Sequence, residues 1–181
     1  MLSHKMGEMR FRRATPHDVD CLLALQAEPD VAPFLAAGRS ATREELLEEV
    51  ERSLVEPESY GRLLIEVPEP GEWRVAGAVD FECRNRRSRI AHLGGLAVHP
   101  EFRGRGYGVA ALRALARLLF DELGYHRLEA VAYGFNERAI EVIERAGFVR
   151  EGIKRRAYWR EPEWVDGVCF GLTQEDVTKS D

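Results

Sequence analysis

The chain has 181 residues, of which 45% are hydrophobic and 31% charged, and its formal net charge is -5. This length suits one ordinary domain, and the composition is that of a soluble globular protein without a membrane-spanning apolar run. The acidic balance argues against a general nucleic-acid binder and modestly favours a cationic partner such as an amine.

The first residues and the cysteines suggest a cytoplasmic protein. The segment from Met1 to Arg10 carries charges without an apolar run behind them, so we expect no secretory signal. Cys21, Cys83 and Cys169 lie far apart in the sequence, which suits neither a disulfide framework nor a zinc site. We therefore expect three small buried hydrophobic side chains and no metal.

The first half of the chain predicts two helices and then strands. An extended segment at Glu8–Arg13 precedes a helix with Thr15 as its N-cap, which ends near Pro29. A second helix opens at Thr42, and Glu45 completes a capping box. Three strands are expected next, at Tyr60–Val67, Trp73–Cys83 and Arg89–His99.

The second half of the chain alternates between helices and strands. The clearest helix is Gly106–Leu123, where leucines recur on one face and Gly124 stops the helix. The remaining predicted elements are a strand at Arg127–Tyr133, a helix at Asn136–Ala146 ended by Gly147, and strands at Phe148–Tyr158 and Trp164–Leu172. Since no repeat, linker or low-complexity tract interrupts them, we predict one α/β domain over residues 1–181.

The segment from Leu96 to Gly108 combines an apolar strand, a loop with alternating glycines and the start of a helix. Glycines let the backbone approach a ligand closely, so successive N–H groups can point at one anion. The helix N-terminus adds a partial positive charge, and Arg103 and Arg105 add whole ones. The pattern therefore predicts a cradle for a diphosphate.

Two common phosphate-binding motifs fit this loop less well. A P-loop requires Lys and then Ser or Thr after its last glycine, whereas Tyr107 and Gly108 follow Gly106 here. A dinucleotide fingerprint lies in an early strand–helix turn, with an acidic residue about 20 residues later. This loop lies in the middle of the chain, and only Glu122 or Glu129 could serve as that acid. A purely structural glycine turn would not account for the two interleaved arginines.

One family carries a similar loop. Val98-His99-Pro100 followed by Arg103-Gly104-Arg105-Gly106-Tyr107-Gly108 resembles the R/Q-x-x-G-x-G/A acyl-CoA signature of the GNAT superfamily of N-acetyltransferases. Downstream, Asn136-Glu137-Arg138-Ala139 and then Gly147-Phe148 are similar to the second motif of that superfamily. The continuation Val149-Arg150-Glu151-Gly152 looks most like the branch with the ribosomal-protein N-terminal acetyltransferases, and the likeness is strongest over residues 88–172.

The resemblance implies a fold and a cosubstrate. The expected fold is α/β (α+β), with a central mixed, mostly antiparallel twisted sheet flanked by helices and a splay between the fourth and fifth strands. The expected cosubstrate is acetyl-CoA, with its pyrophosphate on the backbone amides of the loop. Leu96 N–H would polarise the thioester carbonyl next to a bulge at Gly94-Gly95, and Asn136 would bind the cofactor or cap its helix. The implied cofactor-binding residues are Leu96, Val98, Arg103, Gly104, Arg105, Gly106, Tyr107, Gly108 and Asn136.

The implied reaction is direct acetyl transfer to a primary amine of a small molecule or a protein N-terminus, and a base must first remove the amine's proton. His92 stands where many relatives carry a glutamate, and an imidazole titrates near about 6.5. A hydrogen-bonded strand histidine without catalytic duty is an equally weighted alternative. Asp80 and Glu82 on the neighbouring strand are the other candidate bases.

The general acid is less well defined by the sequence. Many members of the family carry a tyrosine where this chain has Ile143. Tyr133, Tyr158 or solvent could protonate the departing thiolate, since the pKa of a thiol is near about 8.5. The candidate catalytic residues are therefore His92, Glu82, Leu96 and Tyr133.

Two other functions stay open from the sequence. A CoA-binding module that has lost its chemistry would account for Ile143. A toxin-like enzyme that acetylates aminoacyl-tRNA would use the arginine-rich turn at residues 84–89, although the acidic net charge argues against it. We expect an amine acceptor, no membrane and no nucleic-acid partner, and a homodimer is one option for the assembly.

Overall fold

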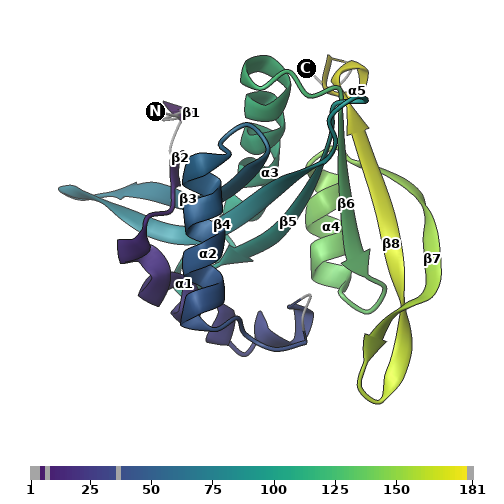
Figure 1. Ribbon diagram of the computed structural model, residues 1–181, viewed down its shortest axis with the longest axis horizontal. Coiled ribbons are helices and arrows are strands. Elements are labelled where there is room, and N and C mark those ends of the chain that lie inside the picture. Colours follow the sequence, from purple (N-terminus) through teal and green to yellow (C-terminus); the bar gives the residue numbers. More distant parts are fainter. Residues whose placement is uncertain (1–4, 7–8, 36–37, 179–181) are drawn as a thin grey trace. The chain divides into compact units, whose positions relative to one another are not determined.

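The computed structural model describes residues 5–6, 9–35 and 38–178 (Figure 1). The chain divides into two compact units, Met1–Glu82 with Gly95–Tyr107 and Cys83–Gly94 with Gly108–Asp181. The single domain over residues 1–181 stays a prediction.

The first unit contains the N-terminal strands and helices. Its elements are β1 (Lys5–Met6), β2 (Met9–Arg13), α1 (Val19–Ala27), α2 (Arg43–Val55), β3 (Tyr60–Glu69), most of β4 (Glu72–Asn85) and the second half of β5 (Ile90–Val98). Short 3-10 helices lie at Pro16–Asp18, Ala32–Phe34 and Pro100–Phe102. The strands β1 to β4 pair as antiparallel neighbours in chain order, and β5 follows β4. Of the predicted first strand, Glu8 lies outside the described residues.

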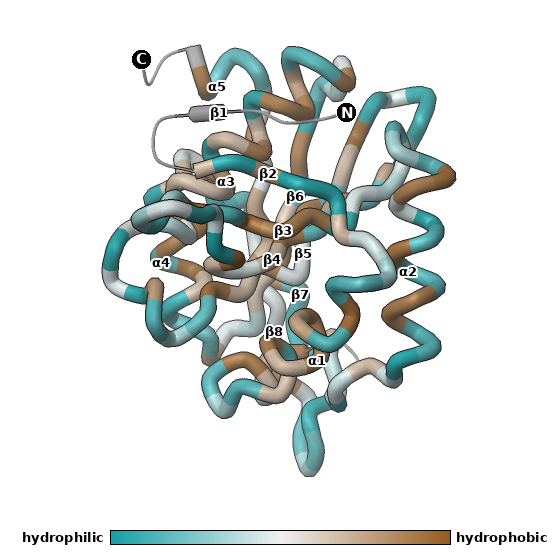
Figure 2. Tube along the Cα trace, turned by 90° about the vertical axis from the view of Figure 1, so that its left-hand side faces the viewer, coloured by the Kyte–Doolittle hydropathy of each residue, from teal (hydrophilic) through white to brown (hydrophobic). Residues whose placement is uncertain are grey.

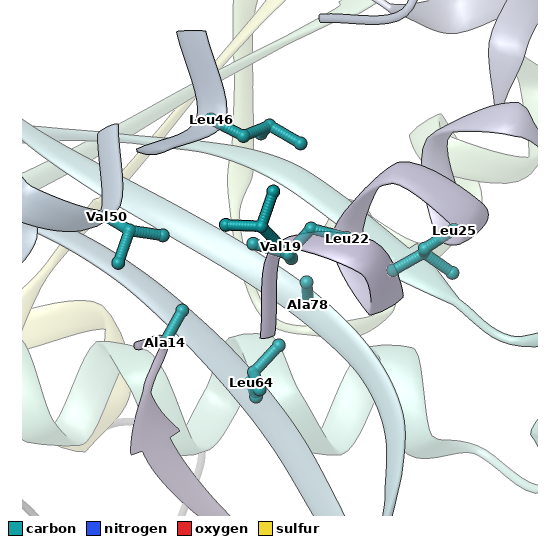
Figure 3. Close-up of a cluster of buried hydrophobic side chains, with 8 residues drawn as sticks. All are labelled: Ala14, Val19, Leu22, Leu25, Leu46, Val50, Leu64 and Ala78. Atoms are coloured by element: carbon teal, nitrogen blue, oxygen red, sulfur yellow. The ribbon is translucent and has the colours of Figure 1, made fainter. Parts of the chain in front are cut away.

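The core of the first unit lies between α1, α2 and one face of β3 and β4. Figure 3 shows eight buried side chains from these elements and the preceding loop: Ala14, Val19, Leu22, Leu25, Leu46, Val50, Leu64 and Ala78. Every residue of β3 from Tyr60 to Val67 is buried, and the trace of β3 is mostly hydrophobic in Figure 2. Such a run is typical of a strand that is covered on both faces.

Both predicted helix starts are confirmed. Thr42 Oγ1 accepts a hydrogen bond from Glu45 N, and Glu45 Oε2 accepts one from Thr42 N, which completes the capping box of α2. The segment after Thr15 begins with a 3-10 turn and becomes α-helical at Val19. Asp18 holds this start in place, because its Oδ2 accepts hydrogen bonds from both Thr15 N and Thr15 Oγ1.

The second unit contains the C-terminal half of the chain. Its elements are the first half of β5, α3 (Tyr107–Arg117), β6 (Arg127–Tyr133), α4 (Glu137–Arg145), β7 (Val149–Arg160), β8 (Glu163–Thr173) and α5 (Gln174–Thr178). The strand order is β5, β6, β8, β7, and β7 and β8 form a long antiparallel hairpin (Figure 1). The predicted helix at Gly106–Leu123 changes into a π-helix at Leu118–Glu122. The wider turn allows three consecutive apolar residues, Leu118 to Phe120, to be buried.

The mixed, mostly antiparallel sheet is confirmed. The strands β5 and β6 pair in parallel from Ile90 opposite Arg127 to Leu93 opposite Ala130, and the hydrogen-bonded ladder ends there although both strands continue. With the short β1 left out of the count, these are the fourth and fifth strands, where the resemblance implied a splay.

The prediction that the cysteines are buried is wrong. Cys21 is exposed on α1, and Cys83 and Cys169 are only half-buried. A cysteine side chain is small enough to occupy a boundary position, so its sequence context alone does not decide its burial.

Over the described residues, no helix combines the length and the hydropathy that crossing a membrane would require.

We predict that the Asp18–Arg12 ion pair gives the first unit an acid-sensitive part of its stability. Burial alone would raise the pKa of Asp18, but hydrogen bonds from Arg12 and Thr15 outweigh it and lower this pKa to about 2. Since the pKa of an unfolded aspartate is about 3.9, the stabilisation is complete above that pH and is lost as the pH falls toward 2. Thermal melts should therefore show a melting temperature gap between wild type and Asp18→Asn at neutral pH that closes toward pH 2.

Asp20→Asn is the matched control for this prediction, because Asp20 lies on the same helix in an exposed ion pair with Arg43. A gap between wild type and Asp18→Asn that stays constant down to pH 2 would contradict the assignment.

Candidate functional site

The glycine-rich loop is open toward the side where side chains would project. Gly104 and Gly106 have left-handed torsions, with φ of 74° and 82°. A Cβ atom built on either glycine would meet no described atom within 4 Å. The loop leads directly into α3, which begins at Tyr107. A ligand can therefore approach the backbone N–H groups here without displacing a side chain.

The two loop arginines have different environments. Arg103 donates from Nε to Val98 O at 2.8 Å and forms an ion pair with Asp30, so only 16% of its side chain is exposed. The side chain of Arg105 is 53% exposed, and its nearest carboxylate, Glu69, is 3.9 Å away. Arg103 thus fastens the loop to the end of β5, whereas Arg105 leaves its charge available to an anion.

Phe102 anchors this loop, although the sequence analysis did not single it out. Its side chain is buried and makes edge contacts with His99 and Tyr107, at ring-centroid distances of 6.3 and 6.5 Å. The guanidinium groups of Arg74 and Arg105 lie over its ring at 5.2 and 5.6 Å. The signal that could have identified it is one large apolar residue between polar neighbours just before the glycines.

The second half of β5 carries the irregularity expected next to Leu96. Gly95 has a left-handed φ of 58° within the strand, a torsion found in bulges of the type that begins with glycine. Beyond it, His99 N donates to Ala76 O of β4 at 2.8 Å. The side chains of Leu96 and Val98 are half-buried on this segment.

The two carboxylates proposed as alternative bases are both bound by arginines. Asp80 Oδ2 accepts from Arg62 Nη1 at 2.9 Å, and Glu82 Oε1 accepts from Arg52 Nη1 at 3.0 Å. Burial alone would lower the pKa of Arg62, but the charges of Asp80 and Glu49, together with the hydrogen bond to Glu49, outweigh burial and raise this pKa. Arg62 therefore stays cationic beside Asp80.

In the second unit, His92 lies opposite Glu129 in the parallel ladder between β5 and β6. Its side chain is half-buried, whereas its neighbours Ala91 and Leu93 point to the buried face. Glu129 is held by Arg127 Nε at 3.0 Å. The ladder thus gives His92 a carboxylate neighbour on the same face of the strand pair.

Tyr133 ends β6 within an aromatic cluster. Its ring stacks on Phe135 at 5.6 Å and meets Tyr158 edge-on at 5.4 Å. The guanidinium of Arg160 lies 4.7 Å from the ring centroid. Ile143, which stands where the resemblance implied a tyrosine, is a buried residue of α4. An isoleucine side chain has no polar atom, so position 143 cannot supply the hydroxyl group that a tyrosine would carry.

Asn136 is the N-cap of α4, because its Oδ1 accepts from Ala139 N at 3.1 Å. The structural role considered from the sequence is therefore present. The amide NH2 group of Asn136 is not used in this cap.

Each unit brings together one part of the predicted site. The first unit contains Glu82, Leu96, Val98, Arg103, Gly104, Arg105, Gly106 and Tyr107, and the second contains His92, Gly108, Tyr133 and Asn136. Among the residues that the structure describes, no group of three or more His, Cys, Asp or Glu side chains is arranged to bind a metal ion.

Comparisons with known proteins identify a family and several relatives. Residues 8–149 match the acetyltransferase (GNAT) domain family. The chain is 30% identical over 103 residues to an uncharacterized prophage-derived N-acetyltransferase of Bacillus subtilis. The aligned segment covers 56% of this chain and 57% of the relative. It is 28% identical over 110 residues to the ribosomal protein uS5-alanine N-acetyltransferase of Escherichia coli, which covers 61% and 57%. The aligned segments thus span little more than half the length of these relatives.

Solved structures share the fold. Spermidine N-acetyltransferase from Vibrio cholerae, in complex with CoA and spermine, aligns with a TM-score of 0.84 and 17% identity over 96% of this chain and 99% of that one. At this level of identity the similarity shows the fold alone.

We predict that introducing a side chain at Gly104 lowers the free energy of unfolding, because the left-handed torsion of this residue is unfavourable for any residue with a Cβ atom. In Gly104→Ala the new Cβ meets no atom, so the strain of a left-handed alanine is the main effect, at about 1 kcal/mol of unfolding free energy. Urea unfolding measures the change. Gly152→Ala is the control, because its Cβ site is equally open but its φ is not left-handed. Equal effects of the two substitutions would contradict a torsional cause.

Proposed function

The chain belongs to the acetyltransferase (GNAT) domain family, and we propose that it transfers an acetyl group from acetyl-CoA to a primary amine. The observation that carries this proposal is the loop before α3. Two left-handed glycines leave its backbone uncovered, an exposed arginine lies between them, and a helix N-terminus follows. This arrangement suits a diphosphate.

Acetyl-CoA, when bound, supplies an activated acetyl thioester, and the residues of the chain fit its diphosphate. The backbone amides from Arg103 to Gly108 are proposed to bind the pyrophosphate, with Arg105 as the charged side chain. Val98 is proposed to pair with the pantetheine arm and Asn136 to bind with its amide NH2 group. Leu96 N–H is proposed to donate to the thioester carbonyl, since it directly follows the irregularity at Gly95.

His92 is proposed as the base that takes the amine's proton. An imidazole can take and release a proton near neutral pH, and the side chain of His92 is half-buried on β5 with Glu129 as its cross-strand neighbour. Glu82 is the alternative, although its carboxylate is already engaged in an ion pair with Arg52 at 3.0 Å. Tyr133 is proposed as the acid, because its hydroxyl-bearing ring ends β6 within the aromatic cluster, where the guanidinium of Arg160 lies 4.7 Å from the ring centroid.

The acceptor is proposed to be a primary amine on a small molecule or a protein N-terminus. By their names, the relative from Escherichia coli acts on ribosomal-protein alanine and the structural neighbour from Vibrio cholerae acts on spermidine, and both of these present an amine. The net charge of -5 favours such cations by long-range attraction.

We expect Gly106→Val to abolish CoA binding in a folded protein. The valine side chain would project where the backbone must meet the pyrophosphate, and no described atom blocks it from occupying that space. Isothermal titration calorimetry with CoA measures the loss. Gly71→Val is the matched control, since Gly71 has a similar φ of 88° and an open Cβ site in the turn between β3 and β4. Unchanged CoA affinity in folded Gly106→Val would remove the proposal.

We expect His92→Ala to lower kcat by about 10²–10⁴ with little change in the KM for acetyl-CoA. In the wild type, kcat/KM should rise with pH through the range in which imidazoles titrate, about 6 to 7, and this step should be absent from the variant. The assay uses spermine, an alanine-started peptide and free L-amino acids as acceptors.

His126→Ala is the control for this experiment, because His126 is exposed in the turn before β6. A near-wild-type rate for His92→Ala, together with a large loss for Glu82→Gln, would move the role of base to Glu82.

A further inference from the structure

An ion pair between a buried arginine and a half-buried aspartate lies next to β5 at Gly95. Arg62 of β3 and Asp80 of β4 are directly opposite in the antiparallel ladder, and their Nη1 and Oδ2 atoms are 2.9 Å apart. Arg62 is only 7% exposed. Replacing a buried ion pair by apolar residues often leaves stability unchanged or raises it, so stability alone is a poor reason for this arrangement.

Arg62 is held from several sides. Its backbone N donates to Ser53 Oγ at 2.9 Å, and its Nη2 binds the carboxylate of Glu49 on α2. Its Nε, by contrast, is buried without a hydrogen-bond partner among the described residues. The guanidinium therefore directs its two terminal nitrogens at the two carboxylates at the expense of its third donor.

The paired atoms of Asp80 and Arg62 also face the backbone of β5. A Cβ atom built on Gly95 would lie well inside normal contact distance of Asp80 Oδ2, 3.0 Å from Asp80 Cγ and 3.1 Å from Arg62 Nη1. Gly95 also has a left-handed φ of 58°. The strand thus passes directly over the ion pair, and both its torsion and the available space require glycine at this point.

We propose that the Arg62–Asp80 pair is a positioning element that holds β5 at Gly95 and so directs Leu96 N–H toward the thioester carbonyl. This inference rests on the proposed acetyl-CoA-dependent function. The chain of contacts runs from Glu49 on α2 through Arg62 and Asp80 to Gly95, and the next residue carries the proposed donor. A hydrogen-bond donor at a reacting carbonyl works only when it is fixed in advance, because its alignment sets how strongly it polarises the bond.

The test is the carbonyl stretching frequency of bound acetyl-CoA labelled with ¹³C at the thioester carbon. A directed N–H donor lowers this frequency relative to free acetyl-CoA, and the measurement needs no acceptor. We expect the lowered frequency in wild type and its return toward the free value in Asp80→Ala, while the affinity for CoA measured by calorimetry stays the same. The affinity is unaffected because the diphosphate loop does not include Asp80.

Arg62→Lys is the second variant. It keeps the buried positive charge, and thus the fold, but an ammonium group cannot make the forked contacts of a guanidinium to two carboxylates. We expect it to lose part of the frequency shift. Glu66→Gln is the control, because Glu66 is a buried carboxylate of β3 that pairs with Arg10 and Arg12 instead. Its frequency should equal that of wild type, whatever its loss of stability.

The outcomes separate the two proposals. If wild type fails to bind acetyl-CoA, the proposed function is wrong. If wild type binds acetyl-CoA but its carbonyl frequency is that of the free thioester, or if Asp80→Ala and Arg62→Lys keep the wild-type frequency, the positioning role is wrong and the proposed function stands.

Discussion

The first unit depends on the burial of β3. Every residue from Tyr60 to Val67 is buried, and two of them, Arg62 and Glu66, are charged. A buried charge without a partner is costly, so each of the two needs an opposite charge within reach. Glu66 finds Arg10 and Arg12 across the β2 side, and Arg62 finds Asp80 on β4 and Glu49 on α2. Covering one strand thus determines where four other charged side chains must lie.

The two charged groups of β3 connect it to different strands, and only the ion pair of Arg62 lies next to a candidate site residue. Glu66 ties β3 to β2, which contributes no candidate site residue. Asp80 touches β5 at Gly95, one residue before Leu96. Two chemically similar ion pairs on one strand therefore have different proposed roles, and the difference comes from which strand lies next to the carboxylate.

In the loop before α3, backbone torsions, and not paired charges, determine which groups are accessible. Gly104 and Gly106 adopt left-handed conformations that other residues resist, and their open Cβ sites leave the N–H groups accessible. Two residues fix the loop to the rest of the unit. The side chain of Phe102 is buried, and the guanidinium of Arg103 donates to Val98 O and pairs with Asp30. Arg105 is left as the exposed cation. The loop is thus rigid where it meets the protein and uncovered where an anion would bind.

The sequence by itself determined the order and type of nearly all elements and the glycine-rich loop, because periodicity, caps and glycine positions are local signals. The helix at Thr42, the strand at Arg127–Tyr133 and the end of α4 at Gly147 all follow from such signals. The short β1 and α5 carry too few residues for a pattern, and the π-turn at Leu118–Glu122 depends on what the helix packs against.

Only the tertiary structure decided which charges are paired. The sequence treats Arg103 and Arg105 alike, yet contacts with residues distant in sequence bury one and leave the other exposed. It offers Asp80 and Glu82 as equal candidates, but their arginine partners come from β3 and α2, 18 and 30 positions away. Such pairings depend on strand register and helix packing. Local sequence does not encode these, because each side chain's partner is chosen by the fold as a whole.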